Sequence, residues 1–505
     1  MLGSLAHHPD QELRRLAETV LQPGFDGTRP PDWLLRRLQA GLGGILLFAR
    51  NTPSVTATRN VTDLIKAENP EAVIAVDEEG GAITRLEAAR GSSWPGNAAT
   101  GRIDDPEVTQ QLAAELGAFI AQTGISLNYA PTADINSDPR NPVIGVRSFG
   151  MRAQLAARHA AAFVRGMQSA GVAACAKHFP GHGDTAVDSH LALPVVRASR
   201  RTMTERELAP FRAAIAADVQ AVMAGHLLVP AWDSARPASL SPALLEGLLR
   251  GELGFQGVIA TDALDMKALD SSASLPGLAL RAISAGADLI CIGARLVDEE
   301  ALLAMRDRVV EAVTVGELPA ERLVEAAGRV RRLAVWQRAA ASRAAAAGAP
   351  DAPRTPAGAA AARALDLTIN LVRHPFPLRK PPVVITLDVP PPTAAGPRTA
   401  WGIGALLAQR MQGTASVTLR QGEDADALCP YLDDHQRPLV IVVRDHPRDA
   451  WAGRILETII SRRPDAGVVD MGLPGTARPG AWHLATYSPS AVSARAAVDL
   501  ITGRR

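Results

Sequence analysis

The densest group of side chains able to do chemistry lies in the segment 177–190, which reads KHFPGHGDTAVDSH. It holds three histidines, two aspartates and a lysine beside glycines and a proline, in a chain with only 11 histidines. Such a group, placed directly after an apolar run, is typical of a functional loop. We therefore expect this segment to contribute to catalysis or to substrate binding.

Asp188 and His190 are two positions apart in this segment. In an extended loop, both side chains leave the same side of the backbone and can form a hydrogen bond. A carboxylate partner fixes the imidazole tautomer and favours its protonated form, which suits a general acid near neutral pH. We therefore expect His190 to transfer protons and Asp188 to orient it. Lys177 and His178 are hydrogen-bond donors suited to hold substrate hydroxyl groups.

A zinc site is the competing interpretation of the same segment, because His178, His182 and Asp184 have spacings that could ligate the metal. That interpretation leaves Lys177 and the Asp188–His190 pair without a role. We therefore expect no metal, and activity that survives a chelator would decide between the two.

Asp262 is the second strong candidate, because it follows the apolar run 257–261. A carboxylate presented at the end of a strand can attack an anomeric carbon and form a covalent glycosyl-enzyme. Asp265 lies three residues further on and is better suited to cap a helix beginning at Met266, since aspartate is favoured at that position. We therefore expect Asp262 to be the nucleophile.

Two more residues are candidates for substrate binding. Asp77 opens the sequence DEEGG after the apolar run 73–76, and its carboxylate could accept hydrogen bonds from substrate hydroxyls. A solvated acidic turn explains the same pattern equally well. Arg147, within 143–150, could donate a bidentate fork to a substrate, although an isolated arginine is more often an ordinary loop residue.

The elements that position these residues are short β-rich runs alternating with helix-period segments such as 110–122 and 154–169. Seven runs occur in the first two thirds of the chain: 44–48, 72–76, 125–129, 172–176, 221–224, 257–260 and 288–292. This alternation is typical of parallel strands covered by helices, in a (β/α)₈ barrel or a doubly wound sheet. Polar residues at the ends of nearly every run favour the α/β barrel, where strand ends converge on one mouth.

The remainder of the chain predicts a second domain. A length of 505 residues suggests two or three domains. The Ala/Pro/Arg-rich stretch 339–362 is typical of a linker, which places the catalytic barrel in 1–338 and a smaller, sandwich-like α/β domain in 363–505. Its apolar runs 383–387, 439–443 and 468–471 alternate with helical segments, and it offers few residues able to do chemistry.

Composition excludes several classes of partner and cofactor. The chain has 53 basic and 52 acidic residues, so nothing predicts binding to nucleic acid or to anionic lipid. No phosphate-binding glycine motif occurs, so we expect no nucleotide cofactor. No apolar stretch approaches the roughly 20 residues that cross a bilayer. The first 15 residues lack an export signal and the three cysteines are scattered, which favours the cytoplasm.

Together these motifs resemble glycoside hydrolase family 3, in its β-N-acetylglucosaminidase branch. The resemblance covers roughly residues 15–335 and depends on four segments in matching order: 77–81, 144–149, 177–190 and 261–267. It implies a barrel followed by the family's optional C-terminal α/β domain. It also implies that Asp262 attacks C1 while His190, paired with Asp188, protonates the leaving oxygen and then activates water, so that configuration is retained.

The resemblance further implies that Asp77, Arg147, Lys177 and His178 line the pocket and hold a terminal N-acetylglucosamine. Muropeptides, chito-oligosaccharides and related small glycosides are then the expected substrates. The low aromatic content, 4%, argues against a long polysaccharide groove and favours removal of one terminal sugar.

Two other functions remain open from the residues alone. A histidine acid/base, unlike a carboxylate, would not repel an incoming phosphate anion, so a phosphorylase is possible in principle. The chain could also be a sugar-binding protein without catalysis, against which the presence of both Asp262 and His190 argues. A β-glucosidase of the same family fits less well, because the Asp188–His190 loop resembles the acetamido-sugar branch.

Overall fold

The computed structural model describes residues 9–189, 192–269, 274–293, 297–347, 355–369, 376–390 and 399–504. The chain forms two compact units. The barrel unit consists of Met1–Glu79, Thr109–Ile144 and Met151–Asp351. The C-terminal unit consists of Gly80–Val108, Gly145–Gly150 and Ala352–Arg505. Each is described by itself.

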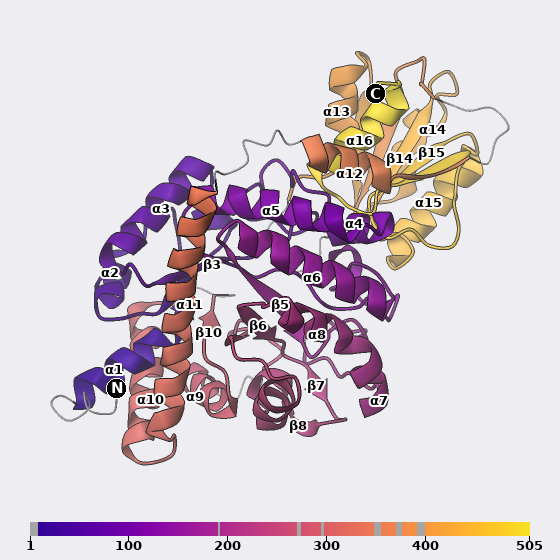
Figure 1. The fold of residues 1–505 in the computed structure, drawn as a ribbon. Helices are drawn as coiled ribbons and strands as arrows, with labels where there is room; N and C mark the ends of the chain where they lie inside the picture. Colours follow the sequence, from indigo (N-terminus) through magenta and orange to yellow (C-terminus); the bar gives the residue numbers. More distant parts are fainter. Residues whose placement is uncertain are drawn as a thin grey trace. The chain divides into compact units, whose positions relative to one another are not determined.

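The barrel unit is built on short parallel strands (Figure 1). They are β1 (Leu21–Pro23), β2 (Gly44–Leu47), β3 (Val73–Val76), β4 (Leu127–Asn128), β5 (Ala173–Phe179), β6 (Ala221–Ala224), β9 (Val258–Thr261) and β10 (Ile290–Ile292). Six pair in the order β2-β3-β4-β5-β6-β9, and β10 pairs with β1.

Backbone hydrogen bonds lead from both edges of the six-stranded sheet toward the β1–β10 pair. The Thr261 amide at the end of β9 donates to the Leu289 carbonyl, directly before β10, over 3.0 Å. The Gly43 amide before β2 donates over 3.0 Å to the Glu18 carbonyl near the end of α1, which leads into β1. The strands therefore follow one another around a ring, which confirms the predicted (β/α)₈-type barrel.

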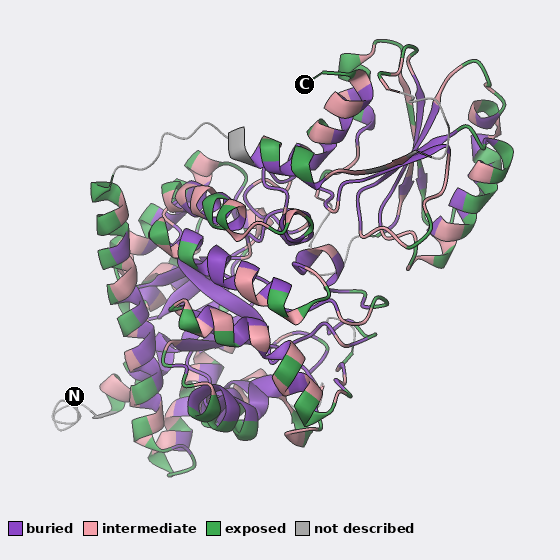
Figure 2. Ribbon diagram, turned by 45° about the vertical axis from the view of Figure 1, so that its right-hand side comes forward, coloured by how far each residue is buried: buried purple, intermediate pink, exposed green. Residues whose placement is uncertain are grey.

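Helices cover the outside of this ring, and their green exposed faces contrast with the purple buried strands in Figure 2. They are α1 (Pro9–Thr19), α2 (Asp32–Gln39), α3 (Val55–Glu68), α5 (Pro106–Gln122), α6 (Ala153–Ser169), α7 (Arg200–Thr202), α8 (Ala209–Ala216), α9 (Leu275–Ala285), α10 (Glu299–Thr314) and α11 (Ala320–Ala346). Wider π-helical turns span Met203–Glu207 and Ala243–Glu252. A short antiparallel hairpin joins β7 (Leu228–Val229) to β8 (Asp233–Pro237).

The inside of the barrel is one buried cluster of alternate strand residues. It includes Val73, Ala75, Leu127, Tyr129, Ala173, Cys175, Ala221, Met223, Val258, Ala260, Leu289 and Cys291. Side chains on a strand alternate between faces. The next residues on the inward face are therefore Asp77 after β3, Lys177 within β5 and Asp262 after β9. This alternation places all three at the carboxyl ends of the strands, where barrels hold their sites.

The C-terminal unit contains a six-stranded sheet of order β11-β16-β15-β14-β12-β13. The strands are β11 (Asp366–Ile369), β12 (Val383–Asp388), β13 (Ala415–Arg420), β14 (Leu439–Val443), β15 (Gly467–Asp470) and β16 (Trp482–Ala485). All neighbours are parallel except β11 and β16. Apolar clusters on both faces pack the sheet between helices, so the predicted α/β domain is confirmed. The helices are α4 (Asn97–Ile103), α12 (Thr355–Ala364), α13 (Gly404–Arg410), α14 (Cys429–Leu432), α15 (Ala450–Arg462) and α16 (Ala491–Thr502).

Two segments from the N-terminal part of the chain fold with this sheet. The Ala400 amide donates to the Ala88 carbonyl over 3.1 Å, and Arg102 lies 4.0 Å from the Asp366 carboxylate. Helix α11 continues to Ala346 and α12 begins at Thr355, both within the stretch predicted as a linker. The boundaries 1–338, 339–362 and 363–505 stay predictions.

Candidate active site

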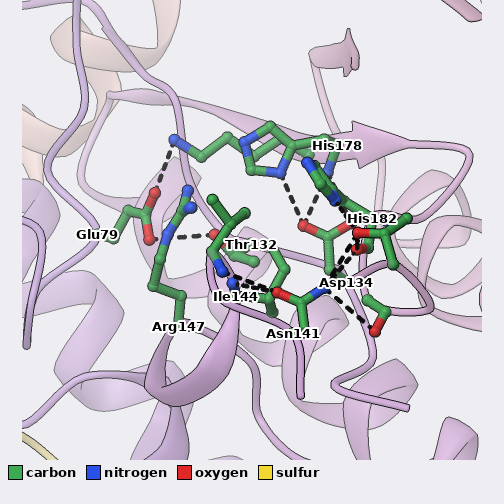
Figure 3. A network of polar contacts seen from close by, with 12 residues as sticks. Glu79, Thr132, Asp134, Asn141, Ile144, Arg147, His178 and His182 are labelled. Carbon is green, nitrogen blue, oxygen red and sulfur yellow. Dashed lines mark hydrogen bonds and ion pairs between the residues drawn. The ribbon is translucent and has the colours of Figure 1, made fainter. Parts of the chain in front are cut away.

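A buried lysine forms ion pairs with two carboxylates at the mouth of the barrel. The Lys177 ammonium lies 2.6 Å from Asp77 Oδ1 and 2.8 Å from Glu79 Oε1. Thr132 Oγ1 donates to the other Glu79 oxygen over 3.1 Å (Figure 3). Lys177 and Glu79 are only 2% and 4% exposed. Asp77 is therefore part of a buried ion cluster and not a solvated acidic turn, and its contact with substrate hydroxyls stays a prediction.

Asp134 is a second buried carboxylate that organises the start of the 177–190 segment (Figure 3). Its Oδ2 lies 2.7 Å from His178 Nδ1, and its Oδ1 accepts the His182 amide over 2.7 Å. The His178 amide also donates to it, over 3.1 Å. A carboxylate on Nδ1 fixes the imidazole orientation and leaves Nε2 as the other functional nitrogen. Asp134 thus fixes the orientation of the His178 ring, and the role of His178 as a substrate-binding donor stays a prediction.

The charge of Asp134 is maintained by these contacts. Burial by itself would raise the pKa of its carboxyl group, but the positive field and hydrogen bond of the His178 ring, together with His182, outweigh burial and hold the pKa below its ordinary range. Asp134 therefore stays ionised at neutral pH and can orient the His178 ring.

Asn141 forms hydrogen bonds with the same segment and with its own loop. Its side-chain oxygen accepts the Val143 and Ile144 amides over 2.9 and 2.7 Å. Its side-chain nitrogen donates to the His182 carbonyl over 2.8 Å. His182 Nδ1 in turn lies 2.9 Å from Thr185 Oγ1. These contacts join the loop after β4 to the loop after β5.

Asp262 lies directly after β9 and is partly exposed. Its amide donates to the Ala224 carbonyl over 2.9 Å, which extends the pairing of β9 with β6. Its Oδ1 accepts the Ala263 amide over 2.8 Å. These two contacts fix the backbone and the carboxylate of Asp262 at the end of β9.

The prediction that Asp265 caps a helix beginning at Met266 is wrong. Residues 266–269 form turns, and the next helix, α9, begins at Leu275 with Ser274 as its cap. Asp265 Oδ1 instead accepts the Gly293 amide over 3.1 Å. The chain passes close to the end of β10 here, and the amide that follows β10 needs an acceptor.

Asp77, Lys177 and Asp262 lie on the inward face at the carboxyl ends of β3, β5 and β9, because they continue the alternation of the buried inward residues of these strands. The Lys177 ammonium contacts Asp77, and β6 pairs with both β5 and β9. The structure therefore brings Asp77, Lys177 and Asp262 to the same end of the barrel. Burial raises the pKa of the inward-facing Cys175 and Cys291 thiols beneath them in the strands.

The other predicted site residues are placed as follows. Asp188 is buried, and its carbonyl accepts the Ala192 amide over 3.1 Å. His190 lies outside the described residues, so its pairing with Asp188 stays a prediction. Arg147 ends a 3₁₀ turn that begins at Gly145 in the C-terminal unit, where its carbonyl accepts the Asn97 side-chain amide over 2.7 Å. Its contact with substrate likewise stays a prediction.

Four residues of the site were not identified from the sequence: Glu79, Thr132, Asp134 and Asn141. The last three lie in the loop that follows the predicted strand 125–129, whereas the sequence analysis considered only polar residues at the strand ends. Extending the same rule over the whole loop would have found them. Glu79 was part of the DEEGG motif, but nothing in the sequence indicated that Lys177 would contact it.

Glu207 is a fully buried carboxyl group close to the 177–190 segment. Arg206 Nε lies 2.6 Å from its Oε1, and Ser137 Oγ donates to the same oxygen over 3.0 Å. Burial raises the pKa of Glu207 to about 7, although Arg206 and Ser137 act in the opposite direction.

This carboxyl group predicts a stability change with a definite sign. Its pKa is higher in the folded state than its ordinary value of 4.5, so the folded state binds more protons between these values. Glu207 then contributes to the free energy of unfolding at pH 4.5. This contribution, about 3 kcal/mol, is lost as the pH rises through about 7. Glu207→Gln should remove this loss, which urea unfolding at pH 4.5 and 7.5 would measure.

The matched control is Glu205→Gln, on the same helical turn, whose side chain is 62% exposed. It should change the pH dependence of the free energy of unfolding by less than about 0.5 kcal/mol. Parallel stability profiles for Glu207→Gln and the wild type would contradict the raised pKa.

Within the described ranges, no group of three or more His, Cys, Asp or Glu side chains is arranged to hold a metal ion. None of the helices in these ranges combines the length and the apolarity needed to span a membrane.

The chain matches known proteins over both units. Residues 34–333 match the family model described as the glycosyl hydrolase family 3 N-terminal domain. A solved structure of a glycoside hydrolase family 3 β-N-acetylglucosaminidase from Paenibacillus sp. str. FPU-7 is 31% identical, with a TM-score of 0.85 and coverage of 97% of both chains.

Curated relatives match mainly the barrel. A β-hexosaminidase from Neisseria meningitidis serogroup C is 37% identical over 277 residues, which is 52% of this chain and 75% of the relative. A β-hexosaminidase A from Pseudoalteromonas piscicida is 31% identical over 330 residues, 61% of this chain and 55% of the relative. The match therefore spans only about half of the length of this last relative.

Proposed function

The chain belongs to glycosyl hydrolase family 3, and on that basis we propose that it is a retaining, exo-acting β-N-acetylglucosaminidase. The observation that supports this most strongly is the position of Asp262, directly after β9, at the same end of the barrel as the Lys177, Asp77 and Glu79 cluster. The names of the curated β-hexosaminidases and of the solved β-N-acetylglucosaminidase agree with a β-N-acetylhexosamine substrate.

In the first step of the proposed reaction, an Asp262 oxygen attacks C1 of the sugar from the face opposite the aglycone. The bond from C1 to the leaving oxygen breaks, and that oxygen takes a proton from His190. In the second step, water gives a proton to His190 while its oxygen bonds to C1 and displaces Asp262. Each step inverts C1, so the β configuration is retained.

The proposed sugar pocket uses the oriented groups around Lys177. Asp77 accepts hydrogen bonds from sugar hydroxyls, while Lys177, His178 and Arg147 donate them. The buried contacts of Lys177 with Asp77 and of His178 with Asp134 fix these groups before substrate arrives. Preorganised side chains bind without paying for their own ordering.

The proposed substrates are muropeptides, chito-oligosaccharides and related small glycosides with a terminal N-acetylglucosamine. Cys175 and Cys291 are buried free thiols, which is compatible with a reducing compartment. On that ground we also propose a cytoplasmic location and a part in recycling cell-wall fragments.

His190→Ala should harm substrates with poor leaving groups far more than those with good ones. Protonation of the leaving oxygen is needed only when the departing alkoxide is basic, and general acid catalysis contributes about 10²–10⁴-fold. The measurement is kcat/KM for a series of aryl N-acetyl-β-glucosaminides that differ in leaving-group pKa. Equal losses across the series would show that His190 is not the acid.

A further inference from the structure

The segment 177–190 contains a buried stretch directly before the proposed catalytic pair. We call residues 181–185 the stem and residues 186–189 the arm, which carries Asp188 and leads to His190, outside the described residues. Most of the stem is buried; in the arm, Ala186 and Val187 are exposed, whereas Asp188 and Ser189 are buried. Because the arm continues directly from the stem, the contacts that hold the stem help to place the arm.

The stem packs against the loop after β4 on one side. The Asp138 amide donates to the Gly183 carbonyl over 3.1 Å. A Cβ atom at Gly183 would lie 1.5 Å from the Ile135 carbonyl oxygen, so only glycine permits this approach. Together with Asn141, these contacts fix one side of the stem.

The opposite side of the stem packs against the helical turn Met203–Glu207. Gly181 has φ +126°, and a Cβ atom there would lie 2.9 Å from the Glu207 Cβ. Arg206 Nη2 lies 2.6 Å from Asp184 Oδ2, and its Nε lies 2.6 Å from Glu207 Oε1. One guanidinium thus joins the stem carboxylate to a fully buried carboxyl group of the barrel wall.

The backbone of this turn is shaped for the contact. The Leu208 amide donates to the Met203 carbonyl, five residues earlier, over 3.0 Å. Such wide π-type turns occur mostly as local bulges within helices and are frequent at functional sites. Arg206 and Glu207 are the side chains of the bulge that face the stem.

We propose that Arg206 is a positioning residue for the acid/base: through Asp184 and Glu207 it holds the stem so that the arm presents Asp188 and His190 to the substrate. The inference rests on the proposed function, because it requires His190 to be the proton donor. Arg206 itself touches neither substrate nor reacting atoms in this role.

A leaving-group series tests this role, because a merely structural defect would lower all rates by the same factor. In Arg206→Ala, the factor by which kcat/KM falls should be about 10-fold larger for a poor leaving group than for dinitrophenol. This is the pattern expected for His190→Ala, but smaller. Arg206→Lys keeps a cation near both carboxylates and should recover part of the loss.

The matched control is Arg201→Ala, because Arg201 forms an exposed ion pair with Glu205 at 2.9 Å one turn away. It should leave the whole series unchanged. Asp184→Asn keeps the shape of the stem and removes its charge, and should reproduce the Arg206→Ala pattern. The double variant should then lose no more than Arg206→Ala alone, since both single variants remove the Arg206–Asp184 contact and Arg206→Ala also removes the contact with Glu207.

The outcomes separate the two claims. A selective loss in His190→Ala and Arg206→Ala, absent from Arg201→Ala, supports the positioning role. A selective loss in His190→Ala alone, or an equal loss across all leaving groups in both Arg206→Ala and Asp184→Asn, overturns it. No selective loss in His190→Ala means that the acid assignment fails, and the positioning role then fails with it.

Discussion

Asp262→Ala is expected to lower kcat for aryl N-acetyl-β-glucosaminides by roughly 10⁵-fold, the scale of losing a covalent nucleophile. Azide should restore part of the rate, because the space left by the carboxylate admits a small anion on the same face of the sugar. The product should be the α-glycosyl azide, since a single inversion then replaces two. Product analysis by NMR distinguishes this anomer from the β-azide expected of His190→Ala.

Asp265→Ala is the matched control for this experiment. Asp265 lies three residues along the chain, and its carboxylate accepts the Gly293 amide, so its loss should affect loop stability and not the covalent step. It should yield no α-azide. An α-azide product from Asp265→Ala, or near-normal turnover in Asp262→Ala, would show that Asp262 is not the nucleophile.

Asp288→Ala is expected to lower the free energy of unfolding by about 3–5 kcal/mol. The Asp288 carboxylate is fully buried before β10 and contacts three guanidinium groups, from Arg250, Arg322 and Arg329. It also accepts the Ile259 amide over 3.0 Å. Without it, partly buried cations lose their common counter-charge. Urea denaturation followed by circular dichroism measures the change.

Asp63→Ala provides the comparison for a solvated ion pair. Asp63 pairs with Arg59 at 2.8 Å on α3, and both side chains are more than half exposed. Its loss should change the free energy of unfolding by no more than about 0.5 kcal/mol. If Asp288→Ala lowered the free energy of unfolding as little as Asp63→Ala, the buried cluster around Asp288 would not stabilise the amino end of β10.

The strands of the barrel could largely be predicted, because each is an apolar run that ends in a polar residue. The run 221–224 coincides with β6, and 72–76 contains β3. Strand β1 was missed because it has only three residues and its central side chain, Gln22, is polar. Gln22 is nevertheless buried, since it accepts from the Tyr129 hydroxyl and donates to the Val73 carbonyl. A satisfied inward-facing amide leaves no hydrophobic pattern.

Predicted helices were less regular in the structure than in the sequence. The segment 204–217 has the hydrophobic period of one helix, but in the structure it overlaps the π-type turn Met203–Glu207, which is followed by α8. Hydrophobic periodicity describes which face is buried and not the local hydrogen-bond spacing. The bulge that presents Arg206 could therefore not be predicted from the pattern.

The site residues also divide into those that could be predicted from the sequence and those that could not. Asp77, Lys177 and Asp262 could be placed at one mouth because strand alternation continues for one or two residues beyond each strand. The strand-end rule, extended over the loop, would have marked Asp134 and Asn141 as candidates. Their partners His178 and His182 could not be predicted, since they lie more than 40 residues away and loops carry no periodic signal. Contacts such as that of Asp134 with His178 depend on tertiary structure alone.

The identity of the nucleophile is tested most directly by trapping. The enzyme would be incubated with 5-fluoro-N-acetylglucosaminyl fluoride, digested with protease and mapped by mass spectrometry. We predict one added sugar per chain, attached to the Asp262 carboxylate. A label on Asp265, Asp77 or any other residue would contradict the account.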